Sequence, residues 1–341
     1  MRIALALVVS LLAGTLTAQQ SSGVTEPSRG RWQDPSKHRI ELITVEEGVR
    51  LEVLDWGGTG KPVVLLPGLG FTAHVFDGFA EKLAENCHVY GITRRGYGAS
   101  SRPASGYTED RLAEDDLRIF TALHLYRPIV AGHSISGNEM SQLGILHSER
   151  IGGLVYLDAL NDSGDDWTDY DALEGQLPEA MKKPPSPSPS DLKSFAAYSE
   201  WRSRTQGVAI PEAEFRNDFL ENPDGSVGDR ITPAYVPQTI MDGGGAHDYS
   251  KIRVPVLAFV GYPPLPQEQI QSNHITDSSE RTIIAAAFGI SVGMIKTRIK
   301  RINRAAGGAR VVELWDANHF VFLSNETDVL REMRAFLGGL N

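Results

Sequence analysis

The chain has 341 residues, of which 41% are hydrophobic and 22% charged, and its formal net charge is −10. These proportions exclude a disordered or fibrous protein and favour one globular α/β domain with a sizeable insertion. The acidic net charge argues against a nucleic acid or an anionic membrane as the partner, because both would repel it.

The first eighteen residues have the pattern of a secretory signal peptide. Arg2 supplies a positive charge, the apolar run that follows is too short to cross a bilayer, and small residues lead up to Ala18. We therefore predict a signal peptide over 1–18, a polar leader over 19–37, and a secreted or periplasmic protein with no stable membrane insertion. The single cysteine, Cys87, fits export because it leaves no internal disulfide to form.

The rest of the chain alternates apolar strands with helices. A hairpin is predicted from 38–45 and 49–57. Further strands are predicted at 62–70, 87–93, 128–134, 153–160, 254–261 and 309–315, and helices near 72–85, 109–125, 135–148 and 325–337. Continuous apolar strands between helices are typical of a doubly wound, mostly parallel sheet covered on both faces.

Residues 161–250 interrupt this alternation. The segment begins with an acidic and aromatic stretch, continues through the tract "KKPPSPSPS", and then contains a predicted helix carrying Phe195, Tyr198 and Trp201. A connection of this length is uncommon in a compact domain unless it is functional. We predict a largely helical cap over 161–250, inserted into a core formed by 38–160 and 251–341.

The strand over 128–134 ends at a serine surrounded by small residues. Gly132, Ser134 and Ser136 match the pattern Gly-x-Ser-x-Gly with serine in the last place. This pattern marks a sharp turn from strand to helix, which lifts the hydroxyl above the sheet and leaves the next amide free to face a substrate. Ser134 is thus a candidate nucleophile.

Four motifs in order along the chain support this interpretation: "LLPGLG" at 65–70, "TRRGYGASS" at 93–101, "AGHSISG" at 131–137 and "ANHFVFLSN" at 317–325. Together they resemble the α/β-hydrolase superfamily, in its capped branch of esterases, epoxide hydrolases, haloalkane dehalogenases and carbon–carbon bond hydrolases. One departure is Pro67, which stands where many members have histidine. The resemblance implies an α/β-hydrolase fold for the core.

The resemblance also implies roles for individual residues. His319, in the "NHF" context after the last predicted strand, corresponds to the general base that activates Ser134. His74, His247 and His274 are competing histidines. The oxyanion hole is expected to use two backbone amides, those of Leu69 and Ile135.

A catalytic triad also needs an acid that orients the histidine, and its assignment is less direct. Many family members place it after the strand that corresponds to 254–261, but here the first carboxylate in that turn is Glu268, behind three prolines. A minority of capped relatives place the acid one strand earlier, where this chain has Asp158 at a strand's carboxyl end. We predict Asp158 as the acid, with Glu268 as the first alternative and another carboxylate, such as Asp277, as a further one.

A serine nucleophile indicates acyl transfer, since epoxide hydrolases and dehalogenases of this fold attack with aspartate. The predicted function is hydrolysis of a small carboxylic ester, lactone or amide through an acyl-enzyme. Carbon–carbon bond hydrolysis and a non-catalytic binding protein of the same fold are the alternatives. The sequence contains no HExxH motif, no paired CxxC motifs, no run of clustered histidines and no phosphate-binding loop, so it implies neither a metal nor another cofactor.

Residues 285–306 also have the pattern of a helix-turn-helix, with a basic second half containing Lys296, Arg298, Lys300 and Arg301. The acidic net charge, the predicted export and the position between two core strands all argue against a nucleic-acid partner. The favoured interpretation is one long surface helix whose apolar half packs on the sheet. The sequence specifies no oligomeric state.

Overall fold

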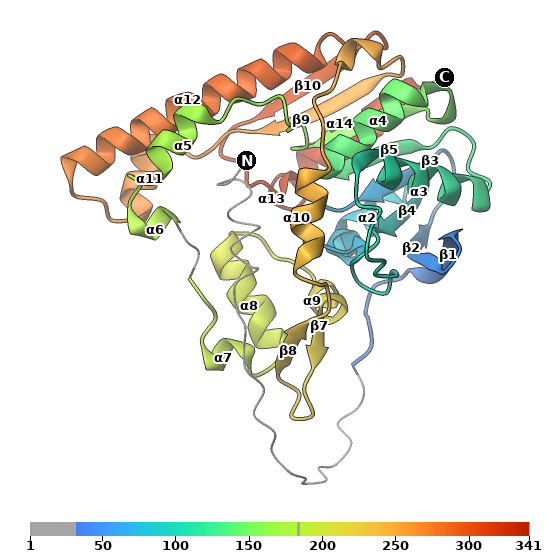
Figure 1. Ribbon diagram of the computed structural model, residues 1–341, viewed down its shortest axis with the longest axis horizontal. Helices are drawn as coiled ribbons and strands as arrows, with labels where there is room; N and C mark the ends of the chain where they lie inside the picture. The colour runs from blue at the N-terminus through green and yellow to red at the C-terminus, as the bar shows by residue number, and fades with distance from the viewer. Residues whose placement is uncertain (1–31, 183–184, 341) are drawn as a thin grey trace.

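The computed structural model describes residues 32–182 and 185–340 (Figure 1). The predicted signal peptide and most of the predicted leader lie outside the described residues. The described chain forms a three-layer α/β core with a smaller, mainly helical unit at one end (Figure 1).

An eight-stranded sheet forms the middle layer, in the order β1-β2-β4-β3-β5-β6-β9-β10. Strand β2 is antiparallel to both β1 and β4, and the remaining neighbours are parallel. The strands are β1 (Arg39–Glu46), β2 (Val49–Gly57), β3 (Pro62–Leu66), β4 (His88–Thr93), β5 (Ile129–His133), β6 (Gly153–Leu157), β9 (Val256–Gly261) and β10 (Ala309–Leu314). The predicted doubly wound, mostly parallel sheet is confirmed.

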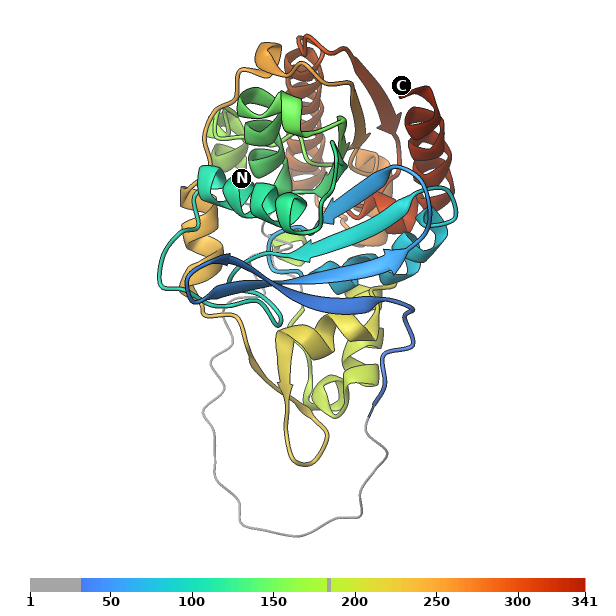
Figure 2. The ribbon, with the colours of Figure 1, turned by 90° about the vertical axis from the view of Figure 1, so that its right-hand side faces the viewer.

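Helices cover both faces of this sheet (Figure 2). Successive side chains of a strand point to opposite faces, so Val63 and Leu65 join one buried cluster and Val64 and Leu66 the other. One face carries η2 (Ala73–Phe76), α2 (Asp77–Leu83) and α14 (Glu326–Gly339), and the other carries α3 (Glu109–Ala122) and α4 (Ser136–Leu146). Shorter helices are η3 (Ser148–Arg150), α11 (Pro266–Ser272) and α13 (Val321–Ser324).

The strand order reverses at β3. The chain passes from β3 to β4 on one side, and then returns to β5 on the other side of β3. Loops that leave the carboxyl ends of β3 and β5 therefore diverge, and such a divergence is where open α/β sheets bind ligands. The loop after β3 contains Leu69, and the turn after β5 contains Ser134.

The elements of the predicted cap segment, 161–250, are α5 (Thr168–Glu174), α6 (Glu179–Lys182), α7 (Pro189–Leu192), α8 (Phe195–Gln206), α9 (Glu212–Asp218), β7 (Phe219–Glu221), β8 (Val227–Arg230), α10 (Tyr235–Asp242) and η4 (Tyr249–Lys251). Of these, α7, α8, α9, β7 and β8 lie in the lower part of Figure 1, whereas α5 and α6 lie near α12 (Ser278–Ile302). The aromatic side chains Phe195, Tyr198 and Trp201 are buried in the same cluster as the core, so they fix the cap onto it.

Residues 278–302 form one continuous helix, α12 (Ser278–Ile302), and not a helix-turn-helix. The prediction that its apolar half packs on the sheet holds for the end of that half, where Ile295 joins the buried cluster on one face of the sheet, as Ile302 of the basic half also does. The part around Ala287 packs instead on the side chains of Tyr170 and Leu177 in the predicted cap. The cause is the length of the helix, because its first turns extend past the end of the sheet (Figure 1).

Helix α12 is also long and apolar enough to cross a membrane by length and composition alone. Its most apolar window has a mean hydropathy of 1.4, and 17% of that window is buried. Its basic end is paired within the protein, since Arg298 and Arg301 both contact Asp165 of the cap.

Candidate active site

The turn between β5 and α4 holds Ser134 in a left-handed backbone conformation, with φ of +57°. Few residues other than glycine adopt this conformation, so a serine held in it indicates a functional position. The turn ends the strand abruptly and starts α4 two residues later. Ser134 is 1% exposed.

The small residues around Ser134 are required by the close approach of the backbone. A Cβ on Gly132 would lie 2.3 Å from Met140 Sδ, and one on Gly137 would lie 1.8 Å from the Ala159 carbonyl oxygen. Side chains at these two positions would collide with helix α4 and with the segment after β6. The Gly-x-Ser-x-Ser pattern thus reflects a turn with no room for side chains at these glycines.

Ser136, which takes the place of the usual last glycine, has a structural function. Its Oγ lies 3.0 Å from the Leu66 carbonyl oxygen, 2.8 Å from that of Pro67 and 2.8 Å from that of His133. One hydroxyl proton can therefore bridge the end of β3 to the turn that carries Ser134. Motif matching alone missed this contact, although the unusual serine was visible in the sequence.

Asp158 and His319 are brought together at the carboxyl edge of the sheet. Asp158 follows β6 with φ of +51°, and its Oδ2 lies 2.6 Å from His319 Nδ1. Its Oδ1 accepts a hydrogen bond from the Gly261 amide at the end of β9, at 3.0 Å. Both carboxylate oxygens are thus held, and the imidazole is oriented with Nε2 as its remaining atom.

Ser134 Oγ and His319 Nε2 are both buried, and neither makes a hydrogen bond to a described residue. His133, directly before Ser134, connects the serine turn to the segment that carries His319. Its Nε2 lies 3.1 Å from the His319 carbonyl oxygen, and the centroids of the two imidazole rings are 4.6 Å apart. Burial, with the charge of His319 adding to it, holds the pKa of His133 well below its usual value. His133 is therefore a neutral packing residue beside the two reactive atoms.

The alternative acids lie elsewhere. Glu268 is exposed and accepts a hydrogen bond from the Leu265 amide, at 2.8 Å, where it caps the start of α11. Asp277 caps α12, accepting hydrogen bonds from the Ser279 and Glu280 amides. Among the described carboxylates, the structure brings Asp158, and neither of these two, to the His319 ring.

The two amides predicted for the oxyanion hole belong to Leu69, in the loop after β3, and Ile135, in the turn after β5. Within the described part of the chain, neither amide is paired with a backbone carbonyl. A Cβ on Gly68 would lie 3.3 Å from Ser134 Cβ, which shows how closely the β3 loop approaches the serine turn. The two loops that carry these amides therefore meet at Ser134.

Comparison with known proteins agrees with this arrangement. A family model described as "Alpha/beta hydrolase family" matches residues 63–332, which is most of the chain. The chain belongs to the alpha/beta hydrolase family. This confirms the family and the fold class inferred from the sequence motifs, and membership supports a hydrolase activity.

Curated relatives from this family match over shorter stretches. A protein named as a non-heme haloperoxidase from Mycobacterium phage D29 is 31% identical over 120 residues, covering 35% of this chain and 43% of the relative. A protein named as a carbamate hydrolase from Caulobacter segnis is 36% identical over 112 residues, covering 32% and 42%. The chain thus spans less than half the length of these curated relatives.

Solved structures of the alpha/beta hydrolase fold match over nearly the whole chain. The structure of E-2-(acetamidomethylene)succinate hydrolase has a TM-score of 0.64 at 15% identity, covering 89% of this chain and all of that one. A structure described as a marine microorganism esterase has a TM-score of 0.57 at 19% identity, covering 85% and 100%. At these identities the likeness shows the fold alone.

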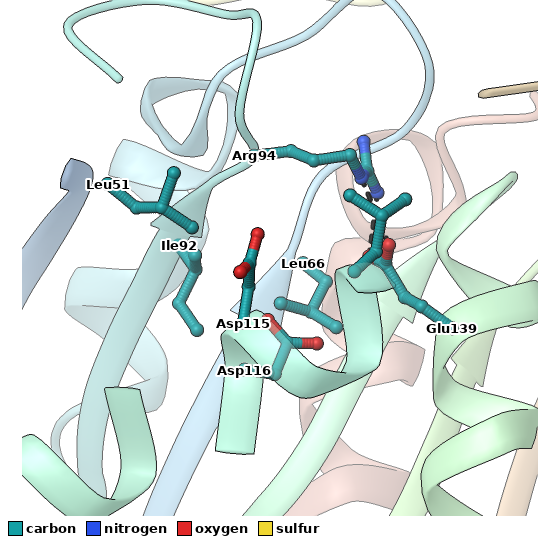
Figure 3. A pocket seen from close by; sticks show the side chains of 8 residues that line it. Leu51, Leu66, Ile92, Arg94, Asp115, Asp116 and Glu139 are labelled. Atoms are coloured by element: carbon teal, nitrogen blue, oxygen red, sulfur yellow. Dashed lines mark hydrogen bonds and ion pairs between the residues drawn. The ribbon is translucent and has the colours of Figure 1, made fainter. Parts of the chain in front are cut away.

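A buried ion pair supports the loop after β3, which contains the amide of Leu69 predicted for the oxyanion hole. Arg94, after β4, pairs with Glu139 of α4 at 2.8 Å and donates a second hydrogen bond to the Pro67 carbonyl at 3.0 Å. The pair lines a small cavity beneath the loop, together with Asp115 and Asp116 of α3 (Figure 3). Neither Ser134 nor His319 lines this cavity, so it lies apart from the candidate catalytic residues.

Asp116 has no charged partner of its own in this cavity. Burial, reinforced by the nearby Glu139 and Asp115 carboxylates, raises the pKa of Asp116 well above its usual value. Its Oδ2 is buried and makes no hydrogen bond to a described residue. A neutral carboxyl fits this position better than a carboxylate does.

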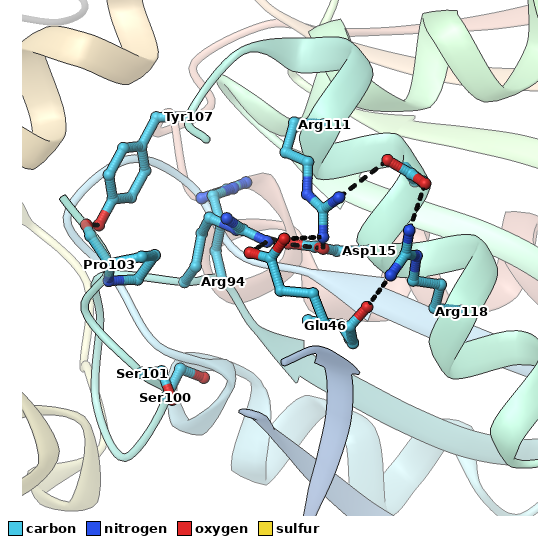
Figure 4. Close-up of polar contacts among 12 residues, drawn as sticks. Glu46, Arg94, Ser100, Ser101, Pro103, Tyr107, Arg111, Asp115 and Arg118 are labelled. Atoms are coloured by element: carbon cyan, nitrogen blue, oxygen red, sulfur yellow. Dashed lines mark hydrogen bonds and ion pairs between the residues drawn. The ribbon is translucent and has the colours of Figure 1, made fainter. Parts of the chain in front are cut away.

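The next residue, Arg95, fixes the loop after β4 to α3 instead. Arg95 Nε donates to Asp115 at 2.6 Å. Arg111 donates to the same carboxylate at 2.8 Å (Figure 4). Glu46 of β1 lies 3.1 Å from Arg95 and 3.2 Å from Arg111. The two arginines of "TRRGYG" thus have different partners. Arg95 contacts residues of α3 and β1, whereas Arg94 contacts α4 and the loop after β3.

Residues of the predicted cap bind the segment after β3 at Gly70 and Thr72. Glu214 of α9 accepts hydrogen bonds from the Thr72 amide at 2.9 Å and the Thr72 hydroxyl at 2.7 Å, and Arg230 of β8 donates to the Gly70 carbonyl at 2.7 Å. Burial raises the pKa of Glu214 to about 8. No local sequence pattern indicates these contacts, because Glu214 and Thr72 are 142 positions apart.

Proposed function

We propose that this protein is a serine hydrolase that cleaves carboxylic ester, lactone or amide bonds of a small molecule through an acyl-enzyme on Ser134. The observation that carries the proposal is the pair of unpartnered buried atoms, Ser134 Oγ and His319 Nε2, beside an imidazole that Asp158 orients. A nucleophile, a base and an orienting acid are the parts that acyl transfer requires.

The proposed reaction begins when Ser134 Oγ attacks the substrate carbonyl carbon while His319 Nε2 removes the hydroxyl proton. The amides of Leu69 and Ile135 stabilise the negative oxygen of the tetrahedral intermediate. The carbon–oxygen or carbon–nitrogen bond then breaks, and the imidazolium gives its proton to the leaving alcohol or amine. Asp158 holds the ring and stabilises its positive charge.

A water molecule completes the cycle. His319 removes a proton from the water, and the resulting hydroxide attacks the acyl-Ser134 carbonyl. The ester bond to Ser134 breaks, the serine oxygen recovers a proton from His319, and the carboxylic acid is released. The net reaction consumes one water molecule and needs no oxidant, reductant or cofactor.

Export is part of the proposal. It rests on residues 1–18, whose charge, apolar run and small residues match a secretory signal peptide. The location proposed for the mature chain is the periplasm or the extracellular medium. Fractionation of cells that express the full chain, with N-terminal sequencing of the exported form, tests both the location and the cleavage near Ala18.

The test of the chemistry is active-site labelling with a fluorophosphonate, followed by intact-mass measurement. Wild-type protein should gain one adduct, located on the peptide that contains Ser134, and Ser134→Ala should gain none. The same variant should lose turnover of p-nitrophenyl acetate. Ser141→Ala, on helix α4, serves as a control that keeps both. Failure of wild type to label would favour the binding-protein alternative.

A further inference from the structure

A cluster of two histidines and two aspartates lies outside the proposed active site. Asp34 and His38 precede β1, His74 lies in η2, and Asp77 begins α2. One potential ligand atom from each of the four side chains lies within 4.8 Å of the others. We call these four residues the His2Asp2 cluster.

We propose that this cluster is a structural site for a divalent transition-metal ion, best suited to Zn²⁺. Two imidazoles and two carboxylates are a ligand set typical of zinc, whereas Ca²⁺ and Mg²⁺ prefer oxygen ligands throughout. Four ligands bound at 2.0–2.2 Å in a tetrahedron stand about 3.4 Å apart. The His74 Nδ1 atom lies 3.5 Å from Asp34 Oδ2 and 3.4 Å from Asp77 Oδ2, which matches that spacing.

The nitrogen atoms of the cluster face oxygen atoms without forming hydrogen bonds to them. His74 is 1% exposed, and neither of its ring nitrogens makes a hydrogen bond to a described residue. His38 Nδ1, in a side chain that is 3% exposed, lies 3.0 Å from Asp77 Oδ1 and is likewise without a hydrogen bond of acceptable geometry. Buried polar atoms are almost always partnered, so His74 Nδ1 and His38 Nδ1 point to a ligand that both of them share.

Each carboxylate of the cluster is held by a neighbouring donor. The Ser36 amide donates to Asp34 Oδ1 at 2.9 Å, and the Trp56 indole donates to Asp77 Oδ1 at 3.1 Å. In both aspartates the other oxygen, Oδ2, faces His74. Outer partners of this kind orient the ligands in protein metal sites.

His74 has the corresponding partner for its second nitrogen. Its Nε2 lies 3.7 Å from Oε1 of Glu52, a residue of β2 that is 1% exposed. A carboxylate behind a ligating imidazole fixes the ring and makes its other nitrogen a better ligand. Glu52 is therefore assigned as an outer partner of His74.

The ion would join two parts of the chain that are distant in sequence. It would tie the segment ahead of β1, through Asp34 and His38, to η2 and the start of α2, through His74 and Asp77. The loop between β3 and η2 contains Leu69, five positions before His74. The site is thus placed to stabilise the loop of the proposed oxyanion hole without taking part in the chemistry at Ser134.

The rival explanation is that both imidazoles are protonated and neutralise the carboxylates with no metal present. The two cases carry the same charge, because two protons and one Zn²⁺ each add two positive charges. They differ in metal content and in the effect of a chelator, which would lower the Tm only if a metal ion is bound. The test must therefore measure the ion itself, and the protein must carry no histidine tag.

The experiment compares protein treated with EDTA and then dialysed against micromolar ZnCl2 with protein kept free of metal. Wild type should retain one zinc per chain by mass spectrometry of the metal, and its Tm should rise by about 5 °C or more. His38→Asn and Asp34→Asn should lose both the stoichiometric zinc and the rise. Circular dichroism checks that each variant folds, and Asp34, with 23% of its side chain exposed, is the milder site to change.

The matched control is His88→Asn. His88 also pairs with an aspartate on this sheet, Asp55, at 2.8 Å, but it lies outside the cluster. This variant should keep the zinc and the rise in Tm. The proposal is overturned if wild type retains no zinc and shows no rise, or if His38→Asn and Asp34→Asn bind zinc as wild type does.

Discussion

The Asp158 carboxylate contacts the His319 ring, with Oδ2 and Nδ1 2.6 Å apart, although the strands that precede these two residues are not neighbours in the sheet. Asp158 follows β6 and His319 follows β10, while β9 lies between them in the sheet. The end of β9 contributes the Gly261 amide, which binds the other carboxylate oxygen. The acid thus occupies the place that a carboxylate at the end of β9 would otherwise fill.

The first prediction concerns this acid. Asp158→Asn should lower kcat for p-nitrophenyl acetate by about 10³–10⁴, because the imidazole loses the group that fixes its tautomer and stabilises its charge. Glu268→Gln should stay within a few-fold of wild type, since Glu268 only caps α11. Steady-state kinetics of the two variants measure this, and the reverse order would place the acid after β9.

The second prediction concerns the base. His319→Ala should lower kcat by several orders of magnitude while the Tm changes little, because the ring accepts the Ser134 proton but is only partly buried. His274→Ala, which changes an exposed histidine near α11, is the control and should behave as wild type. Near-normal kcat in His319→Ala would show that another histidine is the base.

The third prediction concerns Ser136. Ser136→Ala leaves the carbonyls of Leu66 and Pro67 without their hydroxyl partner, so the Tm should fall by about 2–4 °C and kcat/KM by roughly tenfold. Ser141→Ala loses a comparable hydrogen bond, to the Gly137 carbonyl, but does not touch the loop. It should therefore lose stability and keep kcat/KM. Equal kcat/KM in the two variants would remove the proposed role of Ser136.

The fourth prediction concerns pH and Asp116. The pKa of Asp116 is higher in the folded protein than in the unfolded chain, so its contribution to stability is full at low pH and is lost as the pH rises through the folded value. Asp116→Asn keeps the side chain neutral at every pH. Its Tm should exceed that of wild type at pH 9, and the excess should shrink towards pH 4. Asp110→Asn, on the exposed face of the same helix, should follow wild type throughout.

Much of the fold could be predicted from the sequence, because the strands are continuous apolar runs and the helices have a regular apolar spacing. The predicted hairpin, the parallel strands and helix α4 all match the structure within a few residues. The long α12 was predicted as a helix, but only part of its packing was. The stretch around Ala287 faces the predicted cap, and only the three-dimensional position of Tyr170 and Leu177 shows this.

The candidate site and its surroundings also contain residues that the sequence predicts and contacts that it does not. Ser134 and His319 stand in local motifs, so the sequence indicates them directly, and Asp158 could be chosen because the turn after β9 has no earlier carboxylate. The contacts of Glu214 with Thr72, and of His74 with Asp34, join segments that are distant in the chain. No local pattern reports such contacts, although the pairs Asp34-x3-His38 and His74-x2-Asp77 were visible as isolated spacings.

The position of Asp158 directly after β6 has a consequence for the connection between β9 and α12. Residues 262–277 contribute no side chain to the proposed triad, and Glu268 serves only its own helix. Tyr262 and Ile275 are buried, but Pro264 and Leu265 between them are exposed, so the chain can be lengthened there without disturbing the proposed reactive groups. The turn at Pro263–Pro266 is thus a suitable place to insert an epitope or a fluorescent reporter into an active enzyme.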